Sequence, residues 1–373
     1  MYILAIDTSC DETAVAITEG RKVIANGIYS QILIHKKWGG VVPSLAKRAH
    51  QERIDSVIDE VCVKFLKTGP VRNLLPTNAR QDLRVVGNPS DSATRLSNVM
   101  EYIDAVAVTQ GPGLAMALEI GIEKAKELSK TYKKKLIPVN HMEGHIYSCF
   151  AQNSAGKPEL NFSFPYLALL VSGGHTELVL FKDNVEYKVL GATIDDAAGE
   201  ALDKAGKLMG LGYPAGPAIE RLAEEVGNKD FYKLPRPMRQ SGDLNFSFSG
   251  LKTALLYLYR DLSVEEKSKK LKELSSSFQE AVFDSLMIKT RKAIEKTGVK
   301  NLVVAGGVAA NQYLRKKMRI LVKEIGGTIE FPKYKYLNGD NAAMIGIAAY
   351  FKAQKNMYSE DLSKIERVPR MEL

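Results

Sequence analysis

The chain has 373 residues, of which 45% are apolar and 25% charged, and its formal net charge at pH 7 is +9. This composition is typical of a globular protein with room for two domains, and it excludes a disordered or low-complexity chain. The three cysteines are scattered and lack CxxC spacing, which excludes a disulfide framework or a thiolate zinc site and indicates a reducing compartment.

The start of the chain and its charge indicate where the protein works. A strand-like apolar run begins at residue 2, which leaves no room for a signal peptide, and no apolar stretch reaches membrane-spanning length. We therefore expect a soluble cytoplasmic protein. The positive charge would attract a polyanion, so a nucleic-acid partner is plausible.

One pattern of strand, polar turn and strand occurs twice in the chain. It is first predicted at residues 3–17, where the turn contains Asp7 and Asp11, and again at residues 166–181, where the turn contains two adjacent glycines. Such glycines let a backbone approach an anion closely, and the two aspartates can orient a metal or a water. The repeat predicts two duplicated halves whose turns bind a nucleotide.

Between and after these turns the chain reads as alternating helices and strands, with one interruption. Residues 69–99 are rich in Pro, Asn and Ser and lack apolar periodicity, so they are predicted to form an insertion or a long surface loop. We expect an N-terminal α/β domain at 1–140 that contains this insertion. A C-terminal α/β domain is expected at 141–373, with helical insertions at about 195–296.

Two histidines follow a strand predicted at 136–139. On a helix, His141 and His145 lie on one face, so both imidazoles can reach one cation, although paired histidines at this spacing also occur in purely structural roles. Ligands gather at the carboxyl ends of strands, which favours a site. Met142 stands where zinc proteases carry their glutamate base, which argues against a protease. Asp340, near the C-terminus, is either a helix N-cap or a metal carboxylate.

The second half adds acidic residues and a third glycine turn. Asp196, Glu200 and Asp203 have the spacing of one helical face, and their simplest role is to favour the helix dipole. A glycine pair after the strand predicted at 302–305 leads to Asn311, which could hydrogen-bond a ribose or a base.

Eight stretches, in order along the chain, carry a resemblance to one family. They are 6–12, 39–43, 141–145, 171–176, 195–204, 245–253, 306–311 and 340–341. Together they resemble the tRNA threonylcarbamoyladenosine transferase family TsaD, formerly called O-sialoglycoprotein endopeptidases, over nearly the whole chain except 69–99. His175 in the second turn is typical of bacterial members.

This resemblance implies both a fold and a reaction. The fold is the α/β actin-like ATPase (ASKHA) fold, with two duplicated domains, each a mixed five-stranded sheet flanked by helices. The enzyme would be an acyltransferase that moves the threonylcarbamoyl group of threonylcarbamoyl-AMP to the adenosine next to the anticodon of tRNAs that read codons beginning with A. A threonylcarbamoyl-AMP synthase would supply the donor, and the implied partners besides tRNA are a TsaB-like paralogue and a TsaE-like P-loop ATPase.

The resemblance also implies site residues and cofactors. One divalent metal, iron or zinc, would be held by His141, His145 and Asp340, and it would polarise a carbonyl as a Lewis acid. Asp11 and Glu12 match acidic residues tied to activity. ATP or threonylcarbamoyl-AMP would be the bound nucleotide. The implied contacts to that nucleotide are Leu170, Val171, Ser172, Gly173, Gly174, Asp203, Gly216, Glu220 and Asn311.

Some positions depart from the family pattern, and two other functions stay open. Ser44 stands where Glu is usual, Ala115-Met116 replaces a Gly-containing stretch, and Asn338-Gly339 precedes Asp340. One alternative is another enzyme on the same fold, a small-molecule carbamoyltransferase or a sugar kinase, which as a kinase would not depend on His141. The other is a non-catalytic nucleotide-binding scaffold, which would bind no iron or zinc.

Overall fold

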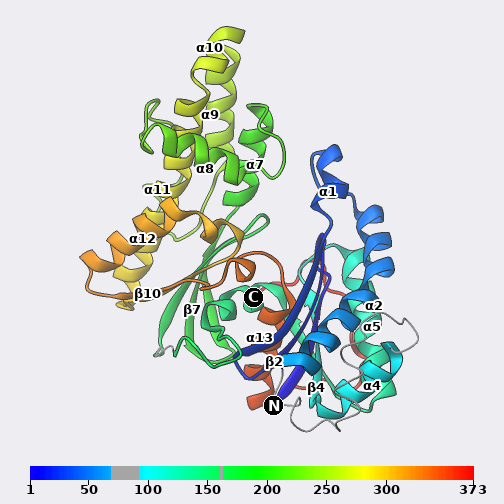
Figure 1. The fold of residues 1–373 in the computed structure, drawn as a ribbon. Helices are drawn as coiled ribbons and strands as arrows, with labels where there is room; N and C mark the ends of the chain where they lie inside the picture. The colour runs from blue at the N-terminus through cyan, green and yellow to red at the C-terminus, as the bar shows by residue number, and fades with distance from the viewer. Residues whose placement is uncertain (69–91, 160–162) are drawn as a thin grey trace. The chain divides into compact units, whose positions relative to one another are not determined.

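The computed structural model describes residues 1–68, 92–159 and 163–373 (Figure 1). Its contacts divide the chain into two compact units, and each unit is built on one five-stranded sheet. Unit 1 comprises Met1–His35, Val41–Asn161 and Gly339–Leu373, and unit 2 comprises Lys36–Gly40 and Phe162–Asn338.

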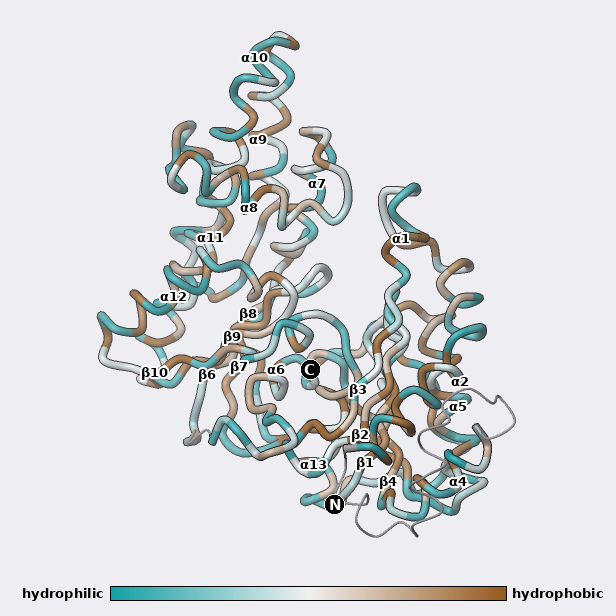
Figure 2. The backbone as a smooth tube through the Cα atoms, viewed as in Figure 1, coloured by the Kyte–Doolittle hydropathy of each residue, from teal (hydrophilic) through white to brown (hydrophobic). Residues whose placement is uncertain are grey.

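The sheet of unit 1 has the strand order β3-β2-β1-β4-β5. An antiparallel meander is formed by β1 (Tyr2–Asp7), β2 (Glu12–Glu19) and β3 (Lys22–Ser30). The order continues with β4 (Ala105–Gly111), which runs parallel to β1, and β5 (Lys135–Asn140), which runs parallel to β4. The central strands carry mostly hydrophobic residues (Figure 2), as strands buried on both faces require.

Helices cover both faces of this sheet. One core joins it to α2 (Pro43–Thr68), α4 (Ser92–Tyr102) and α5 (Ala115–Thr131). On the other face, α13 (Ala342–Gln354) packs against β1, β2 and α6 (His141–Tyr147). Because α13 returns to the N-terminal sheet, the contacts group the segments around α6 and α13 with unit 1, whereas the expected domain boundary was at residue 140.

The segment 69–99, predicted as an insertion or long loop, is only partly described. Residues 69–91 lie outside the described residues. Residues 92–99 are helical and begin α4, whose inward side chains Val99 and Met100 are fully buried. The predicted loop therefore extended too far at its C-terminal end, into α4. The polar residues on the outer face of α4 concealed its helical pattern in the sequence.

Unit 2 repeats the sheet of unit 1, in the order β10-β9-β6-β7-β8. Here β6 (Tyr166–Val171), β7 (Thr176–Asp183) and β8 (Glu186–Ala192) form the antiparallel meander. The parallel neighbours are β9 (Asn301–Ala305), which pairs with β6, and β10 (Thr328–Glu330), which pairs with β9. The same sequence of antiparallel and parallel pairs confirms the predicted duplication.

Most of the helices of unit 2 lie between β8 and β9, in the region where helical insertions were expected. Their apolar faces share one core with Leu167 and Leu169 of β6. The long α11 is followed by Gly298, whose φ of 70° forms a left-handed cap. In the parts of the chain that the structure describes, no helix combines the length and the apolar character needed to cross a membrane. The helices are α7 (Ala198–Leu208), α8 (Gly216–Glu225), α9 (Ser249–Arg260), α10 (Val264–Lys269), α11 (Leu271–Thr297) and, between β9 and β10, α12 (Gln312–Glu324).

Candidate functional site

The two histidines of unit 1 are positioned by the junction of β5 and α6. Asn140, the last residue of β5, caps the helix, since its Oδ1 accepts hydrogen bonds from the backbone N–H groups of Met142 (2.8 Å) and Glu143 (3.4 Å). The helix therefore begins at His141, and His145 follows one turn later on the same face. Their ring centroids lie 4.7 Å apart.

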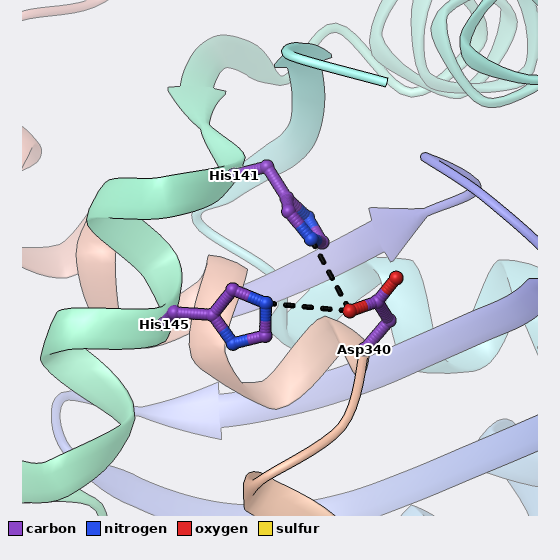
Figure 3. A group of neighbouring side chains, drawn as sticks. All are labelled: His141, His145 and Asp340. Carbon is purple, nitrogen blue, oxygen red and sulfur yellow. Dashed lines mark ion pairs between the residues drawn. The ribbon is translucent and has the colours of Figure 1, made fainter. Parts of the chain in front are cut away.

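Asp340 of the same unit contacts both imidazoles (Figure 3). Its Oδ1 lies 3.3 Å from Nε2 of His141 and 3.3 Å from Nε2 of His145. The N-cap of α13 is Asn341, whose side chain accepts from the backbone N–H of Met344, so the capping role considered for Asp340 belongs to its neighbour. The structure thus brings together the three residues expected to bind a metal, with ligand atoms within 4.8 Å of one another.

Asp7, at the end of β1, stands behind this group. Its Oδ2 lies 3.4 Å from Nδ1 of His141, and its Oδ1 accepts a hydrogen bond from Oγ1 of Thr109 (2.8 Å). Within the described residues, Oδ2 of Asp7 and Nδ1 of His145 have no hydrogen-bond partner although both are buried. A carboxylate behind a metal-binding histidine is a common arrangement, and two imidazoles with one carboxylate suit zinc or non-haem iron. The group therefore fits a divalent cation.

The electrostatics of the group favour a cation as well. Burial opposes a charge on His141, but Asp7 and Asp340 outweigh it and raise the pKa of His141 to about 10. Burial lowers the pKa of His145. Burial also opposes the charge of Asp340, but the two histidines, His141 foremost, hold the pKa of this carboxyl well below its ordinary value. The buried carboxylate of Asp7 and the partly exposed carboxylate of Asp340 thus favour a positive charge between them, which a metal would supply while displacing a proton.

The two acidic residues expected to support catalysis lie in unit 1 where the first turn meets β2. Asp11 is 7% exposed, and its carbonyl oxygen accepts from the backbone N–H of Gln31 (2.9 Å). Burial, reinforced by the carboxylates of Asp340 and Asp11, raises the pKa of Glu12 far above its ordinary value. This shift favours the protonated form of Glu12, which can donate a hydrogen bond.

Unit 2 contains a pocket of about 270 Å³. Of the residues expected to contact a nucleotide, Leu170 and Val171 lie in β6 with fully buried side chains, and Ser172 and Gly174 lie in the turn that follows without lining the pocket. The others do line it. They are Gly173, Asp203, Gly216, Glu220 and Asn311.

The two acidic residues of the pocket both accept hydrogen bonds from the protein backbone. Oδ1 of Asp203 accepts from the backbone N–H of Ala215 (2.7 Å), and Oε1 of Glu220 accepts from the backbone N–H of Gln312 (2.7 Å). Because a carboxylate can accept several hydrogen bonds, both residues retain acceptor capacity for hydroxyl groups in the pocket.

Asn311 is more constrained than expected. Its Oδ1 accepts from the backbone N–H of Leu314 (2.9 Å) as the N-cap of α12, and its Nδ2 donates to Oε1 of Gln279 (2.9 Å). Both polar ends of the side chain are thus used within the protein. Asn311 therefore stabilises the conformation of the third glycine turn. To contact a ligand, its side chain would have to hydrogen-bond to the ligand in addition to these two partners.

The acidic stripe predicted at residues 196–203 is not one helical face. The helix α7 begins only at Ala198, so Asp196 precedes it. Lys204 bridges Asp196 (2.6 Å) and Glu200 (2.8 Å), whereas Asp203 lines the pocket. The three carboxylates therefore have different roles.

The sequence did not reveal two features near these sites. Gly199 lines the pocket at the start of α7, where a Cβ would lie 2.5 Å from the carbonyl oxygen of Ser172, so only glycine fits there. In unit 1, Glu143 is fully buried, and its Oε2 lies 3.5 Å from Nζ of Lys352 on α13. In the sequence, the only sign of the Glu143–Lys352 ion pair is that Glu143 points away from both histidines on the predicted helix.

Two units with the same five-stranded sheet topology have the actin-like ATPase (ASKHA) fold, and one of them holds the His–His–Asp group. Two solved structures agree with this fold. The crystal structure of HypF from T. kodakarensis has a TM-score of 0.57 at 14% identity, covering 95% of this chain and 48% of that chain. Full-length HypF in its phosphate- and nucleotide-bound form gives 0.52 at 13% identity, covering 96% and 56%. This chain spans about half the length of HypF, and the likeness concerns the fold.

Sequence comparison identifies the family. A model of the TsaD family, tRNA N6-adenosine threonylcarbamoyltransferase, matches residues 22–66 and 90–347. Proteins of that name are similar over almost their full lengths in Kosmotoga olearia (42% identity, 96% of both chains) and in Thermosipho africanus (41% identity, 100% of both chains). The chain belongs to the TsaD family of tRNA N6-adenosine threonylcarbamoyltransferases, as the sequence motifs predicted. Between its two matched segments, the family model leaves out residues 67–89, which overlap the first part of the insertion predicted at 69–99.

Proposed function

We propose that this chain transfers the threonylcarbamoyl group of threonylcarbamoyl-AMP to N6 of the adenosine next to the anticodon, in tRNAs that read codons beginning with A. The observation that carries the proposal is the group of two buried histidines, His141 and His145, with Asp340 in a member of this family. An intact set of potential ligands argues against a non-catalytic scaffold.

The pocket of unit 2 is the proposed place for the nucleotide part of the donor, or for ATP. Asp203 and Glu220 offer carboxylate oxygens to hydroxyl groups such as those of a ribose. Gly173 and Gly216 lack side chains, which lets the backbone approach the ligand closely.

In unit 1, we assign His141, His145 and Asp340 as ligands of one divalent cation, iron or zinc, and Asp7 as the residue that orients His141. When bound, this cation supplies Lewis-acid polarisation of a carbonyl. The two imidazoles and one carboxylate of the protein would leave coordination positions of the cation open.

The chain's own acidic residues handle protons in the proposed reaction. The adenosine amine forms a bond to the carbamoyl carbon, the bond from that carbon to the phosphate oxygen breaks, and AMP leaves. Asp11 accepts the proton released by the amine, while Glu12, held protonated, donates a hydrogen bond. An adenosine amine is a weak nucleophile, so positioning contributes more than the strength of the base.

The proposed partners follow from the reaction. The net charge of +9 suits a tRNA, whose phosphates need lysine and arginine. A threonylcarbamoyl-AMP synthase supplies the donor, and a TsaB-like paralogue and a TsaE-like P-loop ATPase complete the set. All of these are expected in the cytoplasm.

Reconstitution tests the proposal. The protein is incubated with tRNA, threonine, bicarbonate, ATP, the synthase and both partner proteins, and the digested tRNA is analysed for the modified nucleoside by mass spectrometry. We expect the nucleoside with the unchanged chain and none with His141→Ala. A complete mixture that yields no modified nucleoside would refute the function, and phosphorylation of a sugar that survives His141→Ala would favour a kinase.

A further inference from the structure

The chain contains a single tryptophan, and its side chain is exposed to solvent. Trp38 is the last residue of the short 3-10 helix η1 (Lys36–Trp38), and 60% of its surface is exposed. Tryptophan combines a large apolar ring with a polar N–H group, and it is enriched on surfaces that bind another molecule.

The turn that carries Trp38 leaves the ring accessible. Gly39 and Gly40 follow it, and a Cβ built on either glycine would meet no atom within 4 Å. The ammonium of Lys37 lies over the ring, with its Nζ 5.6 Å from the ring centroid. No other aromatic side chain among the described residues packs on it.

The charge around the ring is positive. Lys36 and Lys37 are both exposed, and neither forms an ion pair with an acidic side chain of the described residues. Unpaired ammonium groups beside an exposed aromatic ring match the two needs of single-stranded nucleic acid, which are a stacking platform for a base and cations for the phosphates.

We propose that Trp38 stacks on an unpaired base of the tRNA anticodon loop, with Lys36 and Lys37 contacting the phosphates beside it. This assignment rests on the proposed function, which requires an adenosine of that loop to reach the enzyme. Lysine is depleted in the core of protein–protein interfaces, so the two exposed lysines beside the ring disfavour a protein partner.

The single tryptophan provides the test. The full-length protein, with its partner proteins present in tryptophan-free form, is titrated with an anticodon stem-loop RNA and with an RNA hairpin of equal length and charge whose loop is minimal. Selective excitation of tryptophan reports Trp38 alone. We expect saturable quenching by the stem-loop and little by the paired hairpin.

Variants measure the contribution of the ring. Trp38→Ala should weaken tRNA binding by about tenfold or more, in line with the loss of one base stack, whereas Trp38→Phe should retain most of the affinity. Leu33→Ala is the matched control, because Leu33 is 84% exposed and apolar but has no ring for stacking. Its affinity should stay within twofold of the unchanged protein.

The outcomes separate this inference from the proposed function. If Trp38→Ala binds tRNA as well as the unchanged protein while the latter modifies tRNA, the surface assignment is wrong and the function stands. Equal quenching by the paired hairpin, or a variant that loses only a protein partner or self-association, also overturns the assignment. Failure of the unchanged protein to modify tRNA would instead count against the function.

Discussion

Replacement of Lys352 by methionine should destabilise unit 1, because it leaves Glu143 buried without a counter-charge. Glu143 is fully buried, neither of its carboxylate oxygens has a hydrogen-bond partner among the described residues, and Nζ of Lys352 lies 3.5 Å from Oε2. Burial raises the pKa of Glu143, and Lys352 counteracts that rise. In Lys352→Met the carboxyl group avoids a lone buried charge by keeping its proton in the folded state.

The magnitude follows from the proton that the unfolded chain releases. An unfolded glutamate ionises near 4.5, whereas folded Glu143 in the variant has a higher pKa, so the unfolded state binds fewer protons above that pH. Because burial keeps the pKa of Glu143 above its ordinary value even beside Lys352, the loss of stability relative to the unchanged chain begins only above this folded pKa. It then grows by up to about 1.4 kcal/mol per pH unit. At pH 7 the typical cost of breaking a buried ion pair sets the expected loss at about 3 kcal/mol.

Urea unfolding at several pH values is the assay. The double variant Glu143→Gln/Lys352→Met removes the ionisable group and should lose the pH slope. The control is Lys130→Met on α5, an exposed lysine whose replacement should change the free energy of unfolding by less than about 0.5 kcal/mol. A Lys352→Met variant that is as stable as this control at pH 7, or whose loss does not grow with pH, would refute the reasoning.

Three further predictions concern the metal, the pocket and acid stability. Elemental analysis of purified His145→Ala should find no more iron or zinc than the background level. Asp7→Asn should bind the metal about 10- to 100-fold more weakly. A metal content unchanged in both variants would exclude this metal site. Asp203→Asn should weaken nucleotide binding by about tenfold in calorimetry, whereas Asp196→Asn, outside the pocket, should not. Although burial opposes its charge, Asp195 accepts hydrogen bonds from the start of α9 that hold its pKa below the ordinary 3.8. This depressed pKa contributes stability that is complete above pH 3.8 and is lost as the pH falls below it. Asp195→Asn should therefore cost about 1 kcal/mol at pH 7 and less at pH 3, and an equal cost at both pH values in urea unfolding would contradict this.

The features that the sequence predicted are those encoded by local patterns. The repeated strand, turn and strand gave the duplicated sheets, and the spacing of His141 and His145 after a strand placed both rings on one helical face. Asp340 lies almost 200 residues further on, so spacing could not link it to the histidines, and the family resemblance was needed.

Tertiary packing explains what the sequence did not reveal. The helix α6 is buried on all sides and α13 nearly so, and neither therefore shows the apolar stripe that would reveal what it packs against. For that reason neither the return of α13 to the first sheet nor the pair of Glu143 and Lys352 was predicted. Asn311 resembled a ligand-binding residue, but only the fold shows that Gln279 and the start of α12 occupy both ends of its side chain.

Transfer to tRNA under single-turnover conditions tests the central claim most directly. Purified threonylcarbamoyl-AMP and tRNA are mixed with an excess of the metal-loaded protein and its partners, and the modified adenosine is quantified beside the metal content of each sample. The account predicts stoichiometric transfer by the unchanged chain, and neither metal nor transfer with Asp340→Ala. Full transfer by a metal-free Asp340→Ala protein would contradict it.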